Sequence, residues 1–389
     1  MSSPLLQGSV GMIGAGTMGI GIAQVAASAG HHVMLFDVNA EASSRALNAL
    51  HQRLQQRVDA GKADADTTQQ LLARIQIVTV LTELASCALV IEAIAERLEI
   101  KQSLFRDLEA ICSPQTLFAS NTSSLSITAI ASALKHPQRM AGLHFFNPAP
   151  VMKLVEIVRG LETDADTLNA LRELAVAWKK QPVVCRSTPG FIVNRVARPF
   201  YAETLRALEE QIATPATLDA VLRDAGGFAM GPLQLTDLIG HDVNYAVTES
   251  VFHAFGSDPR FQPSLVQKEL VEAGHLGRKS DRGFYRYPSD VQPVIAEFAP
   301  IETGAMPQRI SAHGRWSALP EFAALLQQNG IAIEERKEST ESSPFLRLDE
   351  VTLMLSNGKL SSKIAVETRT PVVQFDLSVN HQQASAIAI

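Results

Sequence analysis

The feature that most constrains this chain of 389 residues is a glycine-rich turn near its N-terminus. A short apolar run, residues 9–13, leads into Gly14-Ala15-Gly16-Thr17-Met18-Gly19, and apolar residues at helical spacing follow it. A second apolar run, residues 32–36, ends at Asp37. A G-x-G-x-x-G turn that follows a strand, opens a helix and precedes a strand with a terminal acid is typical of a dinucleotide-binding βαβ unit.

Each position in this turn has a physical task. Gly14 permits the tight turn, Gly16 lets the backbone approach a pyrophosphate, and Gly19 allows the helix to pack closely on the strand. The free N–H groups of the first helical turn, around Thr17 and Met18, and the positive end of the helix dipole would hold the phosphate charge. The alternative is a glycine-rich turn without a ligand, and the strand–turn–helix context disfavours it.

Asp37 indicates which dinucleotide binds. Its carboxylate would accept hydrogen bonds from the adenosine ribose hydroxyls and would repel a 2′-phosphate. No Arg directly follows Asp37 to accommodate such a phosphate. The sequence therefore favours NAD over NADP as the cofactor.

The rest of the chain predicts a three-part architecture. Over residues 1–186, apolar runs alternate with helical patterns, as in an α/β domain built on a Rossmann-type doubly wound parallel sheet that binds NAD. Beyond residue 40 the expected strands are 75–78, 88–93, 116–119 and 139–145, and the expected helices are 40–74 (one helix or a pair), 98–111 and 126–134. From Pro189 to about Ala273 the pattern is helical, which predicts an all-α domain over residues 187–290.

Residues 291–389 form a third part, which we expect to be an α+β extension. A helix from Pro320 to Asn329, then Gly330 and an apolar strand from Ile331, repeats the helix–Gly30–strand order of the N-terminus. No glycine phosphate loop accompanies this repeat, so we expect a degenerate, partial Rossmann-like segment without a second NAD site. The end of the chain looks rich in strands, with the clearest one at residues 372–376.

Composition and charge exclude several classes of protein. The balance of 34 Lys+Arg against 40 Asp+Glu gives a net charge of −6, which argues against nucleic acid as the main partner. No apolar stretch reaches the roughly 18 residues that a membrane span needs. The first basic residue is Arg45, so we expect a cytoplasmic protein without a targeting signal or a membrane partner. Cys87, Cys112 and Cys185 lack metal-type spacing, so we expect reduced core cysteines and no metal site.

A second dense segment carries the candidate chemistry. His144 ends the predicted strand 139–145, and the carboxyl ends of parallel strands face the ligand crevice of such a sheet. NAD-dependent oxidation of an alcohol needs a group of near-neutral pKa to take the hydroxyl proton, and histidine is the usual choice. Glu156 is the nearest downstream carboxylate, in a strand-like stretch, and would orient the ring. The alternative is a core or surface histidine, which is the commoner role of a lone histidine on a strand.

Several segments of the chain resemble motifs of the 3-hydroxyacyl-CoA dehydrogenase family. They are Gly14–Gly19, Val90–Ala93 with Glu96 and Lys101, Ser120–Leu125, His144–Pro148, Met152–Glu156, Thr188–Arg195, Met230–Pro232 and Gly283–Tyr285. The resemblance spans residues 8–287 and is specific because the motifs keep their order. It implies NAD-dependent, reversible oxidation of (S)-3-hydroxyacyl-CoA to 3-oxoacyl-CoA, a reaction of fatty acid β-oxidation, by a homodimer with an acyl-CoA substrate.

The resemblance also implies roles for individual residues. His144 resembles the general base, and Glu156 resembles the partner that fixes its tautomer. Ser123 and Asn194 resemble residues that hydrogen-bond the reacting oxygen and the substrate beside it. Because Asn194 belongs to the helical part, the site is expected between the first two domains. Asn147 is a candidate substrate contact, with a structural role in a turn as an equal alternative.

Further residues resemble cofactor and CoA contacts of the family. Glu96 and Lys101 resemble cofactor-side residues near the nicotinamide half, and Asn121 resembles a further cofactor contact. The alternative for the two charged residues is a solvated strand-to-helix junction. Lys62 resembles a position that the family uses near CoA, and Arg57 lies one to two helical turns away; a solvated helix face explains these two cations nearly as well.

Two features distinguish this sequence from the shorter members of the family. Ser187 stands where many members have an acidic residue. The segment after Tyr287 is absent from shorter members and looks like that of long bacterial ones, such as 3-hydroxybutyryl-CoA dehydrogenases and the enzymes of phenylacetate breakdown. This suggests the hypothesis that the chain is a long member truncated at its C-terminus.

Two alternatives compete with an active 3-hydroxyacyl-CoA dehydrogenase. One is a non-catalytic NAD-binding protein on the same scaffold, like the lens crystallins related to the family; the presence of His144, Glu156, Ser123 and Asn194 argues against it. The other is a β-hydroxyacid dehydrogenase for free acids, which would use a catalytic Lys, and no such Lys stands near Asn194. The acyl chain length and the pathway do not follow from the sequence.

Overall fold

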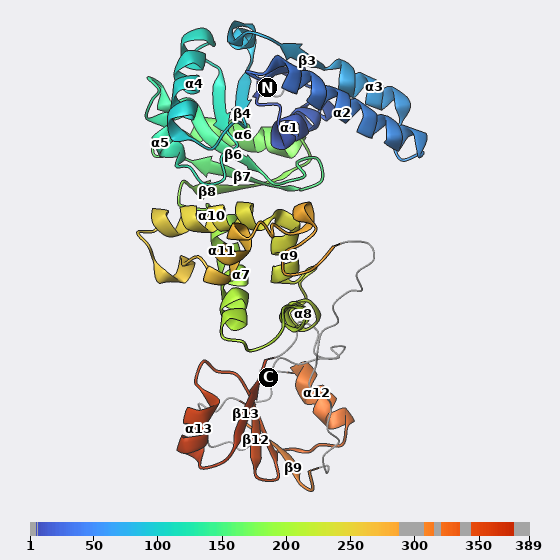
Figure 1. Cartoon of the computed structure of the whole chain (residues 1–389), viewed down its shortest axis with the longest axis vertical. Coiled ribbons are helices and arrows are strands. Elements are labelled where there is room, and N and C mark those ends of the chain that lie inside the picture. The colour runs from blue at the N-terminus through green and yellow to red at the C-terminus, as the bar shows by residue number, and fades with distance from the viewer. Residues whose placement is uncertain (1–4, 6, 288–306, 315–319, 335–343, 377–389) are drawn as a thin grey trace. The chain divides into compact units, whose positions relative to one another are not determined.

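The computed structural model describes residues 5, 7–287, 307–314, 320–334 and 344–376 (Figure 1). The chain forms two compact units, Met1–Arg198 with Glu249–Pro259 and Pro199–Thr248 with Arg260–Ile389. Among the helices within the described ranges, none is long and apolar enough to cross a membrane.

The first unit is built on an eight-stranded sheet with the order β3-β2-β1-β4-β5-β6-β7-β8. Its strands are β1 (Val10–Ile13), β2 (Val33–Phe36), β3 (Ile75–Val78), β4 (Leu89–Glu92), β5 (Leu117–Ser120), β6 (Met140–Phe145), β7 (Leu154–Arg159) and β8 (Gln181–Arg186). Strands β1 to β6 pair in parallel, which confirms the expected Rossmann-type sheet. β7 runs antiparallel to β6, because the loop over residues 146–153 is shorter than the dozen or so residues that a parallel crossover needs.

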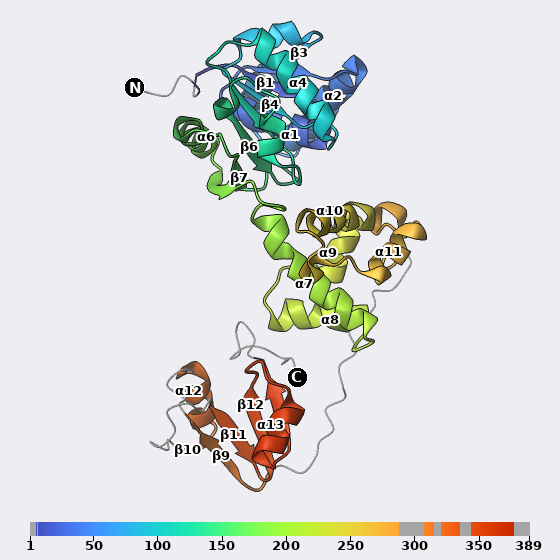
Figure 2. The same ribbon diagram turned by 90° about the vertical axis from the view of Figure 1, so that its left-hand side faces the viewer.

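Helices cover both faces of this sheet (Figure 2). They are α1 (Thr17–Ser28), α2 (Ala40–Asp59), α3 (Ala65–Ala73), α4 (Leu98–Ile111), α5 (Ile127–Ala131) and α6 (Ala165–Ala177). Side chains of α1, α2, α3 and α6 pack in one buried cluster, and those of α4 and α5 pack in a second. Asn39, Asp64, Ser126 and Asp164 each cap the helix that follows by accepting hydrogen bonds from first-turn N–H groups. The cap at Asp64 explains why the expected helix 40–74 is a pair.

The chain over residues 189–273, all of them described, is helical and has no strand, as expected. Its helices are α7 (Val193–Glu209), α8 (Pro215–Ala220), α9 (Pro232–Ile239), α10 (His241–Ala254) and α11 (Leu265–Glu272). Both α7 and α10 contribute residues to each of the two compact units.

The C-terminal part contains a five-stranded sheet with the order β10-β9-β11-β12-β13. Its elements are β9 (Ile310–His313), α12 (Pro320–Gln328), β10 (Ile333–Glu334), β11 (Phe345–Leu348), β12 (Val351–Leu355), α13 (Ser361–Thr368) and β13 (Val372–Phe375). β9 pairs in parallel with β10 and β12 pairs in parallel with β13, whereas β11 is antiparallel to both of its neighbours. The repeat seen in the sequence thus corresponds to a β9–α12–β10 unit in a mixed sheet. We did not expect α13, which supplies the crossover between the parallel strands β12 and β13.

Candidate active site

A histidine and a carboxylate lie opposite each other on β6 and β7. The antiparallel register pairs His144 with Glu156, and His144 Nδ1 donates to Glu156 Oε2 over 2.6 Å. Both residues are buried. Because an ionised carboxylate only accepts, Nδ1 carries the proton and Nε2 is the nitrogen left for a substrate hydroxyl. The structure therefore brings together the two residues that the sequence predicts as a base and its orienter.

The other oxygen of Glu156 is committed to the backbone. Oε1 accepts hydrogen bonds of 2.9 Å from the N–H groups of Ile192 and Val193. Burial alone would raise the pKa of Glu156, but the bond from His144 and these backbone N–H groups outweigh burial and lower the pKa below its usual value. Glu156 is therefore held in its ionised form.

Two aromatic rings enclose the imidazole. Phe146 lies with its ring centroid 4.6 Å from that of His144, and Phe191 lies 5.7 Å away in an edge-on arrangement. Phe191 is buried, and its backbone φ of +49° is in the left-handed region. The sequence analysis did not single out either ring as part of the site, although both belong to the motifs that carry the family resemblance.

Ser123 and Asn194 come from distant parts of the sequence and meet in the first compact unit. Asn194 Nδ2 donates to the carbonyl oxygen of Ser123 over 3.4 Å. Asn194 was expected from the helical part, and it lies at the start of α7, within Met1–Arg198. The Ser123 N–H donates to Glu96 Oε1 over 3.0 Å, so Glu96 orders the loop that carries Ser123.

Lys101 is a buried cation. Its Nζ donates to both carboxylate oxygens of Glu92, at 2.7 and 2.9 Å, and pairs with Glu96 Oε2 at 3.4 Å. Burial tends to raise the pKa of Glu96, but the charge of Lys101 and several hydrogen bonds lower the pKa overall. The alternative of a solvated charge is wrong for Lys101, which is 1% exposed. Glu92 belongs to the motif Val90–Ala93 but was given no role from the sequence; an acid inside the apolar run of β4 was the available signal.

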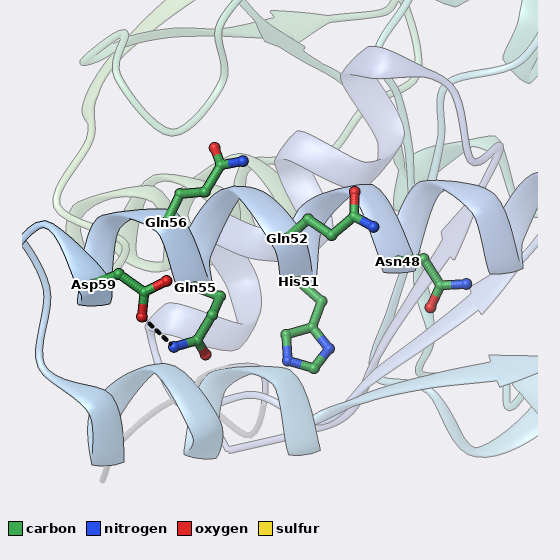
Figure 3. Close-up of a pocket in the computed structure, with 6 residues that line it drawn as sticks. All are labelled: Asn48, His51, Gln52, Gln55, Gln56 and Asp59. Carbon is green, nitrogen blue, oxygen red and sulfur yellow. Dashed lines mark hydrogen bonds between the residues drawn. The ribbon is translucent and has the colours of Figure 1, made fainter.

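Of the remaining candidates, Asn121 is hydrogen-bonded to the strand that carries His144, whereas Asn147 and Lys62 are exposed. Asn121 Oδ1 accepts a hydrogen bond of 2.8 Å from the N–H of Phe145, next to His144. Asn147 is exposed, and its peptide bond to Pro148 is cis. Lys62 is exposed just after α2. The outer face of α2 is rich in amide side chains and forms a surface pocket of about 440 Å³, lined by Asn48, His51, Gln52, Gln55, Gln56 and Asp59 (Figure 3).

The glycine turn between β1 and α1 has the backbone that a dinucleotide needs. Gly14 has φ +98°, and a Cβ there would lie 2.5 Å from the carbonyl oxygen of Ala93. A Cβ at Gly19 would lie 1.8 Å from the carbonyl oxygen of Gly14. In contrast, a Cβ at Gly16 would have no neighbour within 4 Å, so the turn is open to a ligand at Gly16.

The start of α1 suits a phosphate group. Gly16 provides no side-chain cap and no acidic residue lies in the first turn of α1. The N–H groups of Thr17 and Met18 form the positive end of the helix dipole and receive no side-chain cap. Asp37 stands at the end of β2, where Oδ2 accepts from the N–H of Ala15 over 2.8 Å. These residues fit the pyrophosphate and the adenosine ribose of a dinucleotide.

The fold and the site together define a class of protein: an NAD-dependent dehydrogenase with a Rossmann-type domain and a histidine–carboxylate pair. The family model described as 3-hydroxyacyl-CoA dehydrogenase, NAD binding domain, matches residues 9–188. The model described as 3-hydroxyacyl-CoA dehydrogenase, C-terminal domain, matches residues 190–287. The chain belongs to the 3-hydroxyacyl-CoA dehydrogenase family, and NAD is its cofactor.

Individual relatives agree with this assignment. The chain is 49% identical over 368 residues to 3-hydroxyadipyl-CoA dehydrogenase of Escherichia coli K12, covering 95% of this chain and 71% of the relative. It is 43% identical to a probable 3-hydroxybutyryl-CoA dehydrogenase of Bacillus subtilis 168, covering 70% of this chain and 95% of the relative. A crystal structure of 3-hydroxybutyryl-CoA dehydrogenase from E. coli K12 superposes with a TM-score of 0.83 at 48% identity, covering 96% and 73% of the two chains. The chain is thus an NAD-dependent 3-hydroxyacyl-CoA dehydrogenase.

Proposed function

We propose that His144 is the general base and acid of this reaction and that Glu156 is its orienting partner. The observation that carries the proposal is the buried bond of 2.6 Å between His144 Nδ1 and Glu156 Oε2. With Nδ1 protonated, Nε2 accepts the proton of the 3-hydroxyl group, and the ionised Glu156 stabilises the imidazolium that results. NAD, when bound, supplies the acceptor for the hydride that leaves C3. In the reverse direction the imidazolium returns its proton to the 3-oxo oxygen.

We further propose that Ser123 and Asn194 hold the reacting oxygen and the adjacent part of the substrate. The hydrogen bond from the Asn194 side chain to the backbone carbonyl of Ser123 supports this proposal, because the two residues are neighbours in the first unit. Glu96, Lys101 and Asn121 belong, in this proposal, to the nicotinamide side of the site. Their support is the network that joins Glu96 to the Ser123 loop and Lys101.

Asp37 and Lys62 would bind the adenosine-containing ends of NAD and of CoA, respectively. We propose that Asp37 binds the adenosine ribose of NAD and excludes the 2′-phosphate of NADP. Lys62, with Arg57, would contact a phosphate of CoA beside the amide-rich face of α2. Asn147 would be a substrate contact next to the catalytic histidine.

The acyl group and the assembly are finer proposals. The E. coli relative is named 3-hydroxyadipyl-CoA dehydrogenase and the E. coli crystal structure is named 3-hydroxybutyryl-CoA dehydrogenase. We therefore propose an acyl-CoA of β-oxidation type; a kcat/KM series over these two acyl groups would identify the preferred one. We propose a homodimer, supported by exposed apolar side chains at Phe228, Leu238 and Val243.

We propose that the protein is located in the reducing cytoplasm. The support is that its three cysteines are all free thiols.

The test is an absorbance assay with acetoacetyl-CoA and NADH. We expect turnover by the native chain; its absence would favour the non-catalytic alternative related to crystallins. His144→Gln should lower kcat by about 10²–10⁴-fold, the usual contribution of a general base, and leave the Kd for NADH unchanged. The control is His136→Gln, since His136 is exposed and precedes the opposite end of β6. Near-normal turnover of the His144→Gln variant would show that His144 is not the general base of the reaction.

A further inference from the structure

Lys180 is a lysine buried without a carboxylate. Only 8% of the residue is exposed, and among the described residues no ion pair involves it. Its Nζ donates to two backbone carbonyl oxygens instead, those of Ala149 at 2.6 Å and Met152 at 2.8 Å. Burial lowers the pKa of Lys180. A buried ammonium group is costly, so its contacts point to a specific task.

Both carbonyls belong to the loop that joins the two strands of the histidine–carboxylate pair. This loop, residues 146–153, begins directly after β6, which carries His144, and ends at β7, which carries Glu156. The N–H of Gln181 adds a bond of 2.8 Å to the carbonyl oxygen of Lys153. The start of β8 therefore holds the loop at three carbonyl groups.

The same loop also lies against the nucleotide helix α1. A Cβ at Gly21 of α1 would lie 3.3 Å from Ala149 Cβ and 3.5 Å from Pro150 Cδ. Ala149 is thus fixed from two sides, by packing on α1 and by the ammonium group of Lys180. The loop that starts two residues after His144 is therefore tied both to α1 and to the start of β8.

We propose that Lys180 is a positioning residue, which anchors the loop 146–153 and thereby sets His144 at the correct distance from the nucleotide helix. The inference rests on the proposed role of His144 as the general base. Lys180 donates hydrogen bonds to two backbone carbonyl oxygens. In the proposed mechanism it contacts no reacting atom. Its effect is on alignment, and a misplacement of about 1 Å in an active site lowers the rate by roughly 10²-fold.

The test compares Lys180→Met with Lys179→Met. Methionine has a similar length but donates no hydrogen bond, and Lys179 is an exposed neighbour that serves as the control. For Lys180→Met we expect kcat with acetoacetyl-CoA to fall about 10- to 100-fold. We expect the KM for NADH to change by less than about threefold, because the glycine turn is left intact. Lys179→Met should match the native chain.

A kinetic isotope effect separates alignment from general stability. With NADH deuterated at its transferring position, the isotope effect on kcat should increase in Lys180→Met, because hydride transfer becomes slower than the other steps. Lys180→Arg should restore part of kcat, since a guanidinium group also donates to two carbonyls.

The outcomes separate this inference from the proposed function. A folded Lys180→Met with native kcat and an unchanged isotope effect would overturn the positioning role, while a slow His144→Gln would still support the base. If Lys180→Met does not fold, the same two measurements on Lys180→Gln decide the question. Full activity of His144→Gln would instead remove the basis of both proposals.

Discussion

At the scale of single residues, one carboxylate connects two parts of the candidate site. Glu156 binds the His144 ring through Oε2 and the start of α7 through Oε1, which accepts from Ile192 and Val193. The next residue in α7 is Asn194. A change at Glu156 is therefore expected to disturb both the tautomer of His144 and the position of Asn194.

We predict that the Glu156→Gln variant has a lower kcat and a lower free energy of unfolding than the native chain, and that the difference in the free energy of unfolding depends on pH. An amide can accept on one side only, so one set of bonds is lost and kcat should fall about 10²–10⁴-fold. The pKa of Glu156 in the folded state is below its usual 4.5, so the carboxylate stabilises the fold fully above that value and loses this contribution as the pH falls through the lowered pKa. Urea unfolding should give the largest difference between native chain and variant near neutral pH and a smaller one in acid. A difference independent of pH would contradict this prediction.

The pairing of His144 with Glu156 could be predicted from the sequence, because both residues lie in strand-like stretches separated by a short loop. Their chemical roles stay predictions until the variants are measured. The sequence could not reveal that Lys180 and Lys101 are buried, since a lysine beside a helix end is normally solvated. Lys180 is buried against backbone carbonyls of a loop 28 and 31 residues earlier, which have no signature in the side-chain pattern. Lys101 is buried because Glu92, its partner nine residues earlier, lies inside the core.

At the scale of elements, two buried carboxylates hold the helical part together. Asp219 accepts bonds of 2.8 Å from the N–H groups of Leu233 and Gln234 at the start of α9. Asp237, on α9, accepts from His241 Nε2 at 2.6 Å and from the N–H groups of Phe284 and Tyr285, each at 2.9 Å. A Cβ at Gly283 would lie 2.0 Å from Asp237 Oδ1. This packing explains why a glycine stands in the Gly283–Tyr285 motif.

We predict that Asp237→Asn destabilises the helical part strongly. The amide side chain would turn one acceptor into a donor that faces other donors, so the free energy of unfolding should fall by about 3–5 kcal/mol. The control is Asp242→Asn, which removes an exposed ion pair with Lys279 and should cost less than about 1 kcal/mol. Urea unfolding measures the free energy of unfolding of both variants. Equal losses would contradict the prediction, because they would show that the buried hydrogen bonds of Asp237 stabilise the fold no more than the exposed ion pair of Asp242.

Helices and strands could be predicted from the sequence wherever a single physical rule determines them. Short apolar runs became parallel strands because they are buried on both faces, as the fully buried β4 shows. The direction of β7 was not predicted, although the short loop 146–153 already excludes a parallel crossover from β6. Helix α13 was not predicted, since the end of the chain was expected to be rich in strands. Which strands pair is a property of the sheet as a whole and is not encoded in a single segment.

At the scale of the whole molecule, the two family models end where the helical part ends, whereas the Escherichia coli relative matches 95% of the chain. The C-terminal family model stops at residue 287, and the B. subtilis relative is covered to 95% of its length by 274 aligned residues. The C-terminal part has its own five-stranded sheet (Figure 1). Ala312, Leu326 and Leu346 form a small buried cluster in this part. All candidate catalytic, cofactor and substrate residues precede it.

We therefore predict that a chain ending after residue 290 keeps its activity and its assembly. Its kcat/KM with acetoacetyl-CoA should stay within about threefold of the full chain, because the proposed site groups are retained, and light scattering should give the mass of a dimer. The chain must extend at least to residue 287, because Tyr287 Oη donates a hydrogen bond to Asp237 over 2.8 Å. A chain ending after Ser280 would lack this bond and those from the N–H groups of Phe284 and Tyr285. We expect its helical part to unfold. A folded but inactive chain of 290 residues would instead assign the C-terminal part a direct role in turnover.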